Sequence, residues 1–267
     1  MIALLDQLGG AGEGRTLLQR LRESDQPPRL LAQSMAASPA FEQLYKQART
    51  GEIGVEGGIE ADAAFVGLTD LPSGLSFDKL FDLHFRPRLG KRADGFAAIF
   101  AALPKPPADL TMIETGCMRI PRNWEGDGQS TFMFDALARD RGGLLFSIDV
   151  TPESLETARR ACSSATQLIL NDSVAALYAL SRAMPAPVSL LYLDSYDLDV
   201  ANPVPSAIHH ALELAAARPL IASGTIVCVD DFGIGADGGK GMILDKFFSR
   251  IRAEVIYCGY QKVWRVR

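Results

Sequence analysis

Two short stretches decide the fold: residues 189–197, SLLYLDSYD, and residues 224–231, GTIVCVDD. Each is an apolar run of strand length that ends in aspartate, at Asp194 and at Asp230-Asp231. Strands that are apolar on both faces are typical of a parallel sheet, because helices cover both sides of such a sheet. The two stretches therefore predict parallel strands whose carboxylates meet at one edge of the sheet.

The same pattern continues over residues 110–267. Three more strands are expected, at residues 111–114, 144–150 and 167–171, and four helices alternate with the strands, at residues 128–139, 152–163, 174–184 and 205–217. This alternation predicts an α/β fold with a Rossmann-like, mostly parallel sheet. A helix is expected at 241–251, and the last two strands, 255–260 and 262–266, lie so close in sequence that they must pair as an antiparallel hairpin.

The N-terminal part of the chain has a different pattern. Apolar residues at helical spacing over 15–22 and 30–47 predict helices, and the glycine-rich, acidic residues 51–75 read as a linker. We therefore expect a helical N-terminal extension and linker over residues 1–75 and one α/β domain over residues 76–267.

The composition excludes several classes of protein. The chain has 267 residues, of which 48% are hydrophobic and 22% charged, so it is not a disordered chain. Its longest apolar runs are interrupted by charges, which argues against a membrane span, and a net charge of −5 argues against nucleic-acid binding. Four separated cysteines and an N-terminus without a basic segment predict free thiols and a cytoplasmic location. Whether the chain forms a homo-oligomer stays open.

Acidic residues recur where the predicted parallel strands end: Glu114, Asp149, Asp172, Asp194 and the pair Asp230-Asp231. Ligands of open α/β sheets bind at that edge. Any one aspartate there could instead cap a helix, and Asp172 is expected to do so. A series of five strand ends favours a binding site over five independent caps.

The second strand and the loop after the first strand bear on the cofactor. Asp149, at the end of the second strand, suits both ribose hydroxyls of NAD or of S-adenosylmethionine. NAD enzymes carry a G-x-G-x-x-G sequence directly after the first strand, where the pyrophosphate meets a helix N-terminus, and residues 114–119 lack it. S-Adenosylmethionine has no phosphate and tolerates a looser acidic loop, so it is the favoured cofactor.

Residues 110–267 resemble a class I S-adenosylmethionine-dependent methyltransferase. Glu114-Thr115-Gly116 is similar to the first motif of that family, although residues 117–125 look like an insertion into it. The resemblance implies that six residues bind the cofactor: Glu114, Thr115 and Gly116 in the first motif, Asp149 at the ribose, and Asp172 and Ser173 beside the adenine.

The two opening stretches resemble those of the metal-dependent O-methyltransferases of the catechol, caffeoyl-CoA and macrocin groups. That resemblance implies that Asp194, Asp230 and Asp231 bind a divalent metal. An all-oxygen ligand set suits Mg²⁺, or Mn²⁺ or Ca²⁺, and three clustered carboxylates repel one another without a cation. The alternative is that Asp231 caps a turn and Asp194 meets only solvent.

The general base is a lysine or a histidine in those families, three residues after the aspartate of the fourth strand. This chain has Asp197 at that place, and a carboxylate suffices if a metal has already lowered the pKa of the acceptor hydroxyl. Asp197 is therefore the expected catalytic base. His209 and His210 are alternatives, but they fall inside a predicted helix, where a packed histidine is commoner.

The predicted function is a divalent-metal-dependent O-methyltransferase that acts on a hydroxyl of a small molecule, a natural product or a saccharide. Two alternatives stay open: a nicotinamide-dependent oxidoreductase, and a non-catalytic binding module on a methyltransferase fold. The aspartate at position 197 is the best support for the second alternative. The glycine-rich loop 233–241 does not have the spacing of a phosphate-binding loop, and is expected to be a substrate lid.

Overall fold

The computed structural model describes residues 71–105, 109–127, 129–184, 187–234 and 238–267. The chain divides into two units, residues 1–61 and 62–267, and all described residues belong to the second. The helical extension predicted over residues 1–75 therefore lies almost entirely outside the described residues and stays a prediction.

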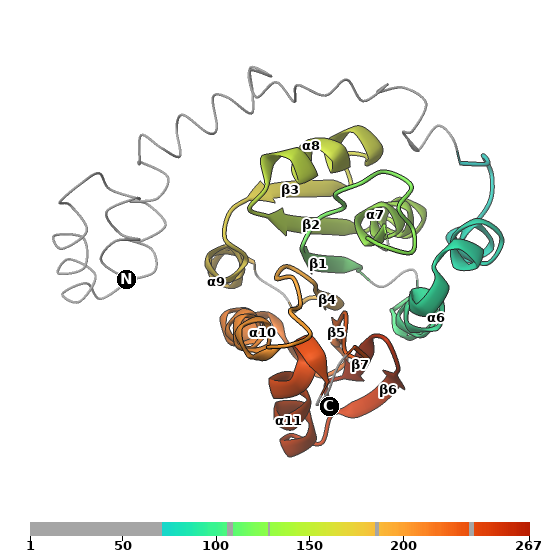
Figure 1. Cartoon of the computed structure of the whole chain (residues 1–267). Helices are drawn as coiled ribbons and strands as arrows, with labels where there is room; N and C mark the ends of the chain where they lie inside the picture. The colour runs from blue at the N-terminus through green and yellow to red at the C-terminus, as the bar shows by residue number, and fades with distance from the viewer. Residues whose placement is uncertain (1–70, 106–108, 128, 185–186, 235–237) are drawn as a thin grey trace, which may run out of the picture. The chain divides into compact units, whose positions relative to one another are not determined.

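A seven-stranded sheet forms the centre of the described unit, in the order β3-β2-β1-β4-β5-β7-β6 (Figure 1). The strands are β1 (Thr111–Thr115), β2 (Leu144–Asp149), β3 (Thr166–Leu170), β4 (Leu190–Leu193), β5 (Ile226–Val229), β6 (Glu254–Cys258) and β7 (Lys262–Arg265). The first five run parallel, and β7 is antiparallel to both of its neighbours. This confirms the predicted α/β fold, with a mostly parallel, Rossmann-like sheet and an antiparallel C-terminal hairpin.

Two helices precede β1, namely α5 (Phe77–Leu80) and α6 (Ala93–Ala102). The helices after β1 begin and end close to the predicted residues: α7 (Ser130–Arg141), α8 (Pro152–Ala161), α9 (Ser173–Ala183), α10 (Val204–Ala217) and α11 (Met242–Arg250). A short π-helical segment, Phe81–Phe85, and two 3₁₀ turns, Arg86–Arg88 and Gly90–Arg92, connect α5 to α6. The predicted cap is confirmed, since Asp172 Oδ1 accepts a hydrogen bond of 3.0 Å from the Ala175 N–H at the start of α9.

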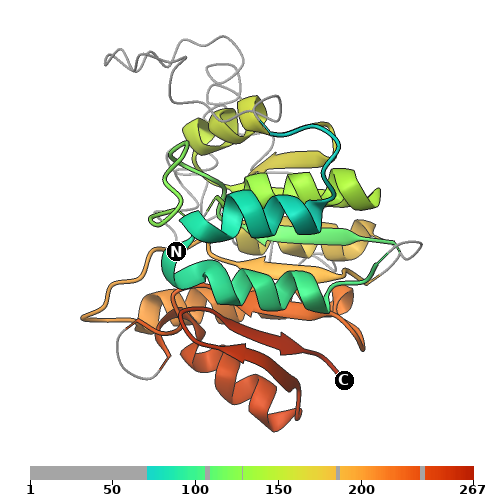
Figure 2. The ribbon, with the colours of Figure 1, turned by 90° about the vertical axis from the view of Figure 1, so that its right-hand side faces the viewer.

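Alternate residues of each strand face two hydrophobic clusters, one on each side of the sheet. Met112 and Tyr192 pack with α5, α6, α7 and α8, whereas Ile113 and Leu191 pack with α9, α10 and α11. Burial on both faces is the reason why the strands read as continuous apolar runs. Figure 2 shows the helices of residues 77–102 lying in front of the sheet.

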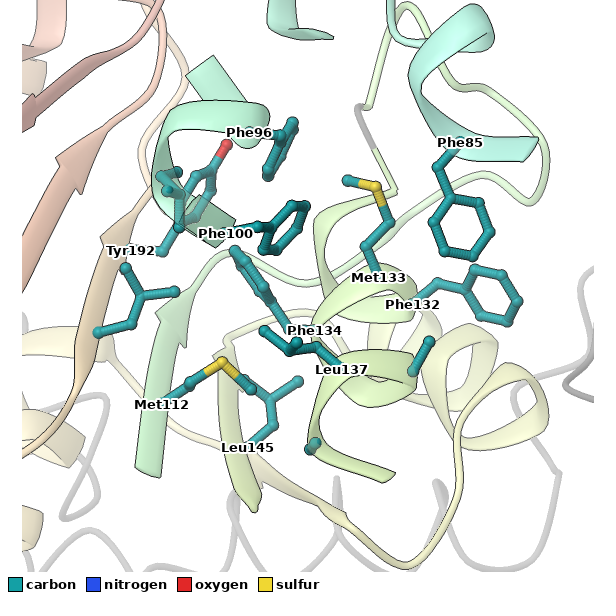
Figure 3. Packing of buried hydrophobic residues seen from close by; sticks show 14 of the residues in the cluster. Phe85, Phe96, Phe100, Met112, Phe132, Met133, Phe134, Leu137, Leu145 and Tyr192 are labelled. Atoms are coloured by element: carbon teal, nitrogen blue, oxygen red, sulfur yellow. The ribbon is translucent and has the colours of Figure 1, made fainter. Parts of the chain in front are cut away.

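Aromatic side chains join the segment of residues 77–102 to the sheet (Figure 3). The Phe96 ring on α6 stacks on Tyr192 of β4, with ring centroids 5.7 Å apart. The Phe85 ring stacks on Trp124 at 5.5 Å, so this tryptophan, in the loop after β1, is buried. This packing fixes the start of α6 next to the ends of β4 and β5.

A candidate active site at the carboxyl edge of the sheet

The loop after β1 crosses directly to the end of β4. Gly116 has φ +83°, and a Cβ at this position would lie 2.5 Å from the carbonyl oxygen of Asp194. The Gly116 N–H donates to the Ile148 carbonyl at 2.9 Å, which ties the loop to β2 as well. Glycine is required here both by the left-handed conformation and by the close approach of the two backbones.

Gly116→Ala should lower the free energy of unfolding by about 3 kcal/mol or more, from the left-handed conformation together with overpacking. Gly142→Ala is the matched control, because Gly142 also has a positive φ, +70°, but has open space around its Cβ position. That control should lose only about 1–2 kcal/mol. Urea unfolding of both variants measures the difference, and equal losses would contradict the close approach.

Glu114 lies below this loop, inside the protein. Its side chain is fully buried, and Oε2 accepts hydrogen bonds of 2.7 Å from the hydroxyls of both Thr131 and Ser147. Burial raises the pKa of Glu114 from 4.5 to about 7, although the hydroxyl hydrogen bonds oppose the rise. The side chain supports the loop from beneath, and cofactor binding by Glu114 stays a prediction.

A raised carboxyl pKa makes a prediction about stability and pH. The folded state binds the Glu114 proton more tightly than the unfolded state, so the contribution of Glu114 is fully present below about pH 4.5 and is lost as the pH rises through about 7. Glu114→Gln resembles the protonated acid and should gain about 3 kcal/mol relative to wild type across that window. Urea unfolding at a series of pH values tests this, with the exposed Glu153→Gln as control; a pH-independent difference would contradict it.

The other predicted cofactor residues line the same edge. Asp149 accepts hydrogen bonds from the backbone N–H groups of Cys117 and Thr151, at 2.9 and 2.7 Å, one on each carboxylate oxygen. Thr115 is buried at the end of β1, and Asp172 caps α9. Each carboxylate oxygen of Asp149 still has a second lone pair for a ligand hydroxyl.

Ser173 belongs to a buried polar network beneath the turn that follows β4. Its hydroxyl lies 2.9 Å from His209 Nε2, and the neighbouring Ser195 donates to Glu213 Oε1 at 2.6 Å. Glu213 Oε1 is also 3.5 Å from His209 Nε2, so serine and carboxylate meet the same ring nitrogen and do not form a catalytic triad. Burial lowers the pKa of His210 to about 4, which fits a packed histidine. The network fixes the turn that carries Asp194.

Three carboxylates come together where β4 and β5 end. Asp194, Asp230 and Asp231 each offer an oxygen, and these oxygens lie within 4.8 Å of one another. The pairing of Leu193 with Val229 at the ends of the two strands places them side by side. The structure thus brings together all three residues that the sequence predicts as metal ligands; the structure does not test metal binding itself.

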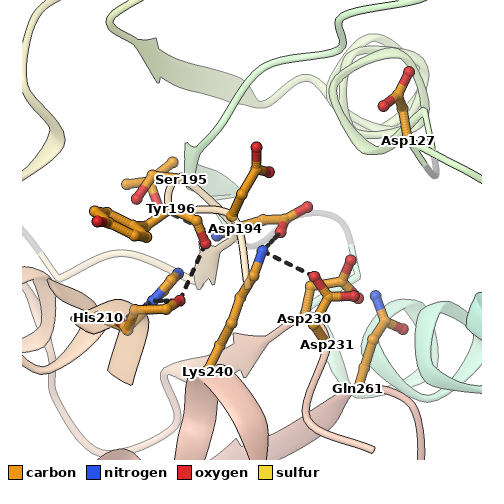
Figure 4. Close-up of polar contacts among 12 residues, drawn as sticks. Asp127, Asp194, Ser195, Tyr196, His210, Asp230, Asp231, Lys240 and Gln261 are labelled. Carbon is orange, nitrogen blue, oxygen red and sulfur yellow. Dashed lines mark hydrogen bonds and ion pairs between the residues drawn. The ribbon is translucent and has the colours of Figure 1, made fainter. Parts of the chain in front are cut away.

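Two buried cations, Lys240 and Arg92, occupy the same cluster. Figure 4 shows the lysine among the carboxylates. Lys240 Nζ lies 2.5 Å from Asp194 Oδ1 and 3.0 Å from Asp231 Oδ2. Arg92 Nε lies 2.8 Å from Asp230 Oδ2. Neither contact is predicted from the sequence. The only local signal was a lysine placed soon after the Asp230-Asp231 pair, in the loop expected to be a lid; residues 235–237 of that loop lie outside the described residues.

The cations set the ionisation of the cluster. Burial raises the pKa of Asp194; the Lys240 ammonium opposes this, and the neighbouring carboxylates add to it. Burial also raises the pKa of Asp230 against the effect of Arg92. For Asp231 the balance is reversed, because Lys240 and the Tyr260 hydroxyl outweigh burial and hold its pKa below the usual range. Asp231 is therefore the most firmly ionised of the three.

Asp197 lies apart from the cluster. Its side chain is 83% exposed and pairs with Arg119 Nη1 at 3.1 Å, and the same arginine also pairs with Asp127 at 3.2 Å. Arg119 thereby ties the loop after β1 to the segment after β4. In this arrangement Asp197 has a cationic partner, Arg119.

Comparison with known proteins gives only distant likenesses. No protein-family profile matches the chain, and no curated protein matches it. Among solved structures, MycE methyltransferase from the mycinamycin biosynthetic pathway, in complex with Mg and SAH, has a TM-score of 0.41 at 15% identity and covers 96% of this chain. The calicheamicin methyltransferase CalS11 has a TM-score of 0.41 at 13% identity, covering 85% of this chain and 93% of its own. The O-methyltransferase NovP has a TM-score of 0.42 at 16% identity, and the match covers 70% of this chain and 79% of the NovP chain.

The chain spans 63% of the length of the MycE structure. Within the part of the chain that the structure describes, every helix is too short or too polar to cross a membrane.

Proposed function

We propose that this protein is an S-adenosylmethionine-dependent O-methyltransferase that uses a divalent cation. The observation that carries the proposal is the convergence of Asp194, Asp230 and Asp231 within 4.8 Å at the sheet edge where the Gly116 loop also lies. The acceptor is proposed to be a hydroxyl of a small molecule, a natural product or a saccharide.

The proposed cofactor site runs along the ends of β1, β2 and β3. Gly116 keeps the loop close to β4, and Glu114 and Thr115 support the loop from below. Asp149 supplies acceptor oxygens for the ribose hydroxyls, and Asp172 and Ser173 stand at the start of α9, beside the proposed place of the adenine.

The proposed metal ligands fit a hard divalent cation such as Mg²⁺, Mn²⁺ or Ca²⁺, because all of them are carboxylate oxygens. Asp230 Oδ1 is buried and has no hydrogen-bond partner among the described residues, so a cation would satisfy it. A bound cation would lower the pKa of the acceptor hydroxyl.

The proposed reaction transfers the methyl group of S-adenosylmethionine to the acceptor oxygen, while the bond from that carbon to sulfur breaks and the hydroxyl proton passes to a carboxylate of the chain. Asp197 stays the proposed base, with Arg119 as its ion-pair partner. The remaining work of the chain is to position the two reactants and to exclude water.

The proposal extends to the whole chain. Residues 76–267 are proposed to be the methyltransferase domain, and residues 1–75 a helical extension. The thiols of Cys117, Cys162, Cys228 and Cys258 are free, which supports the proposed cytoplasmic location.

Calorimetric titration with S-adenosylhomocysteine is the direct test. We expect binding at about micromolar strength, and a loss of at least about tenfold in Asp149→Ala, since hydrogen bonds to a charged group are removed. Asp140→Ala, on the exposed side of α7, is the matched control and should bind as wild type does. Asp149→Asn keeps one acceptor oxygen and serves if the alanine variant unfolds.

The same titration separates the alternatives. Tight NADH binding without S-adenosylhomocysteine binding would overturn the methyltransferase proposal in favour of an oxidoreductase. S-Adenosylhomocysteine binding without methyl transfer to any hydroxyl acceptor would support the non-catalytic binding module.

A further inference from the structure

Lys240 is an unusual lysine because its side chain is almost fully buried. Lysine is rarely buried unless its charge is paired. Here the ammonium is paired with two of the three proposed metal ligands, Asp194 and Asp231. We infer that Lys240 is the resident cation of the carboxylate cluster, and that a divalent metal binds there by displacing the Lys240 ammonium group. The inference rests on the proposed function for the identity of the displacing ion.

The ammonium group of Lys240 lies where a bound metal ion would lie. Lys240 Nζ lies at hydrogen-bond distance from oxygens of both Asp194 and Asp231, and Figure 4 shows the side chain reaching between them. A divalent ion bound by the same carboxylates would have the ammonium as a direct neighbour. Two cations at such a distance repel strongly, so the two occupants exclude each other.

The charges of the cluster also favour the exchange. Three carboxylates, Asp194, Asp230 and Asp231, face two cations, Lys240 and Arg92, which leaves one net negative charge in a buried place when all of them are ionised. Exchanging the ammonium for a divalent ion balances the cluster. The buried Asp230 Oδ1, which has no hydrogen-bond partner in the described part of the chain, points to the same deficit of positive charge.

Arg92 and Lys240 are held differently, and this difference decides which cation leaves. Arg92 is held at three points: Asp230 at 2.8 Å, the Glu125 carbonyl at 2.6 Å, and the face of the Tyr260 ring at 4.8 Å. Lys240 is held by carboxylates at the end of a flexible chain of four methylene groups. Lys240 is therefore the exchangeable cation, and Arg92 is the permanent one.

The packing around Lys240 indicates how the exchange occurs. The backbone on both sides of Lys240 is closely packed: a Cβ on Gly239 would lie 2.3 Å from the Asp231 carbonyl oxygen, and one on Gly241 would lie 2.6 Å from Val229 Cγ1. The turn is thereby fixed against the end of β5. Displacement is accordingly a rotation of the lysine side chain and leaves the turn in place.

The test is Mn²⁺ titration of the full chain, by calorimetry and by the electron paramagnetic resonance of free Mn²⁺, with no cofactor or acceptor present. Lys240→Met keeps the length of the side chain and removes the competing charge, so it should bind Mn²⁺ at least about tenfold more tightly than wild type. In EDTA the same variant should melt at a lower temperature than wild type, and Mn²⁺ should restore it. Lys240→Gln, which keeps hydrogen-bond donors but not the charge, replaces it if the methionine variant does not fold.

Lys262→Met is the matched control. Lys262 is also buried and paired, with its Nζ 2.6 Å from Asp245 Oδ1, which is not one of the three clustered aspartates. Its loss should lower the melting temperature without changing Mn²⁺ affinity.

Unchanged or weaker Mn²⁺ binding in the Lys240 variants would overturn the inference, as would the absence of Mn²⁺ binding in both wild type and variants. Failure of the methyltransferase proposal is seen separately, as absence of S-adenosylhomocysteine binding.

Discussion

Asp194→Asn is expected to lower the rate of methyl transfer by about 10²- to 10⁴-fold, the range that activation of a hydroxyl and removal of its proton contribute. Asp194 is the proposed metal ligand at the end of β4, and Asn keeps its size but removes its charge. Affinity for S-adenosylhomocysteine should stay within about threefold of wild type, because the carboxylate serves the acceptor. Single-turnover transfer, together with calorimetry, measures both quantities.

Asp199→Asn is the control for this prediction. Asp199 lies on the same segment, and its side chain accepts a hydrogen bond from the Ala201 N–H, which asparagine also accepts. Wild-type activity of Asp194→Asn, or full turnover of the wild-type protein in excess EDTA, would contradict the proposed metal site.

Asp197→Asn belongs in the same assay. If Asp197 is the base, the rate should fall by about 10²-fold or more. A rate near that of wild type would reject the base assignment and leave Asp197 only as a partner of Arg119.

Arg92→Met is expected to lower the free energy of unfolding by about 3–5 kcal/mol, the usual cost of leaving one member of a buried ion pair without its partner. Both side chains are buried, at 7% exposure for Arg92 and 0% for Asp230, and they lie 2.8 Å apart. The loss should shrink at low pH, where Asp230 becomes protonated in the variant. Urea unfolding at two pH values measures both effects.

Lys91→Met is the control for Arg92→Met. Lys91 is the preceding residue, and its ammonium lies 5.7 Å from the centre of the same Tyr260 ring, but it is exposed. Its loss should change stability by less than about 1 kcal/mol. Equal losses in the two variants would show that the pair with Asp230 does not stabilise the fold.

The sequence by itself determined the sheet and the meeting of the three aspartates. Runs such as Leu190–Leu193 and Ile226–Val229 are apolar at every position, because helices cover both faces of the sheet. Such a pattern is local, so it predicts a buried strand even when the helices that cover the strand are unknown. Since parallel strands end at a common edge, the positions of Asp194 and Asp230 at the strand ends were enough to predict that they lie together.

Only the tertiary structure decided which charges meet those aspartates. Arg92 precedes Asp230 by 138 residues and reaches it because Phe96 and Phe85 anchor their segment on the sheet and on the loop after β1. Lys240 enters the cluster because the turn of Gly239–Gly241 packs against the end of β5. The contact of Arg92 with Asp230 has no local signal, and the closeness of Lys240 to Asp231 in sequence does not by itself predict that the ammonium group also reaches Asp194.

The same distinction explains the directions of the Glu114 and Asp197 side chains. Both follow or end a strand in the sequence, and both were predicted to act at the site. The structure buries Glu114 under Thr131 and Ser147 and turns Asp197 outward to Arg119. A strand fixes where its end lies, but the direction of each side chain beyond the end depends on the loops that pack around it, and those loops are set by contacts that only the folded chain makes.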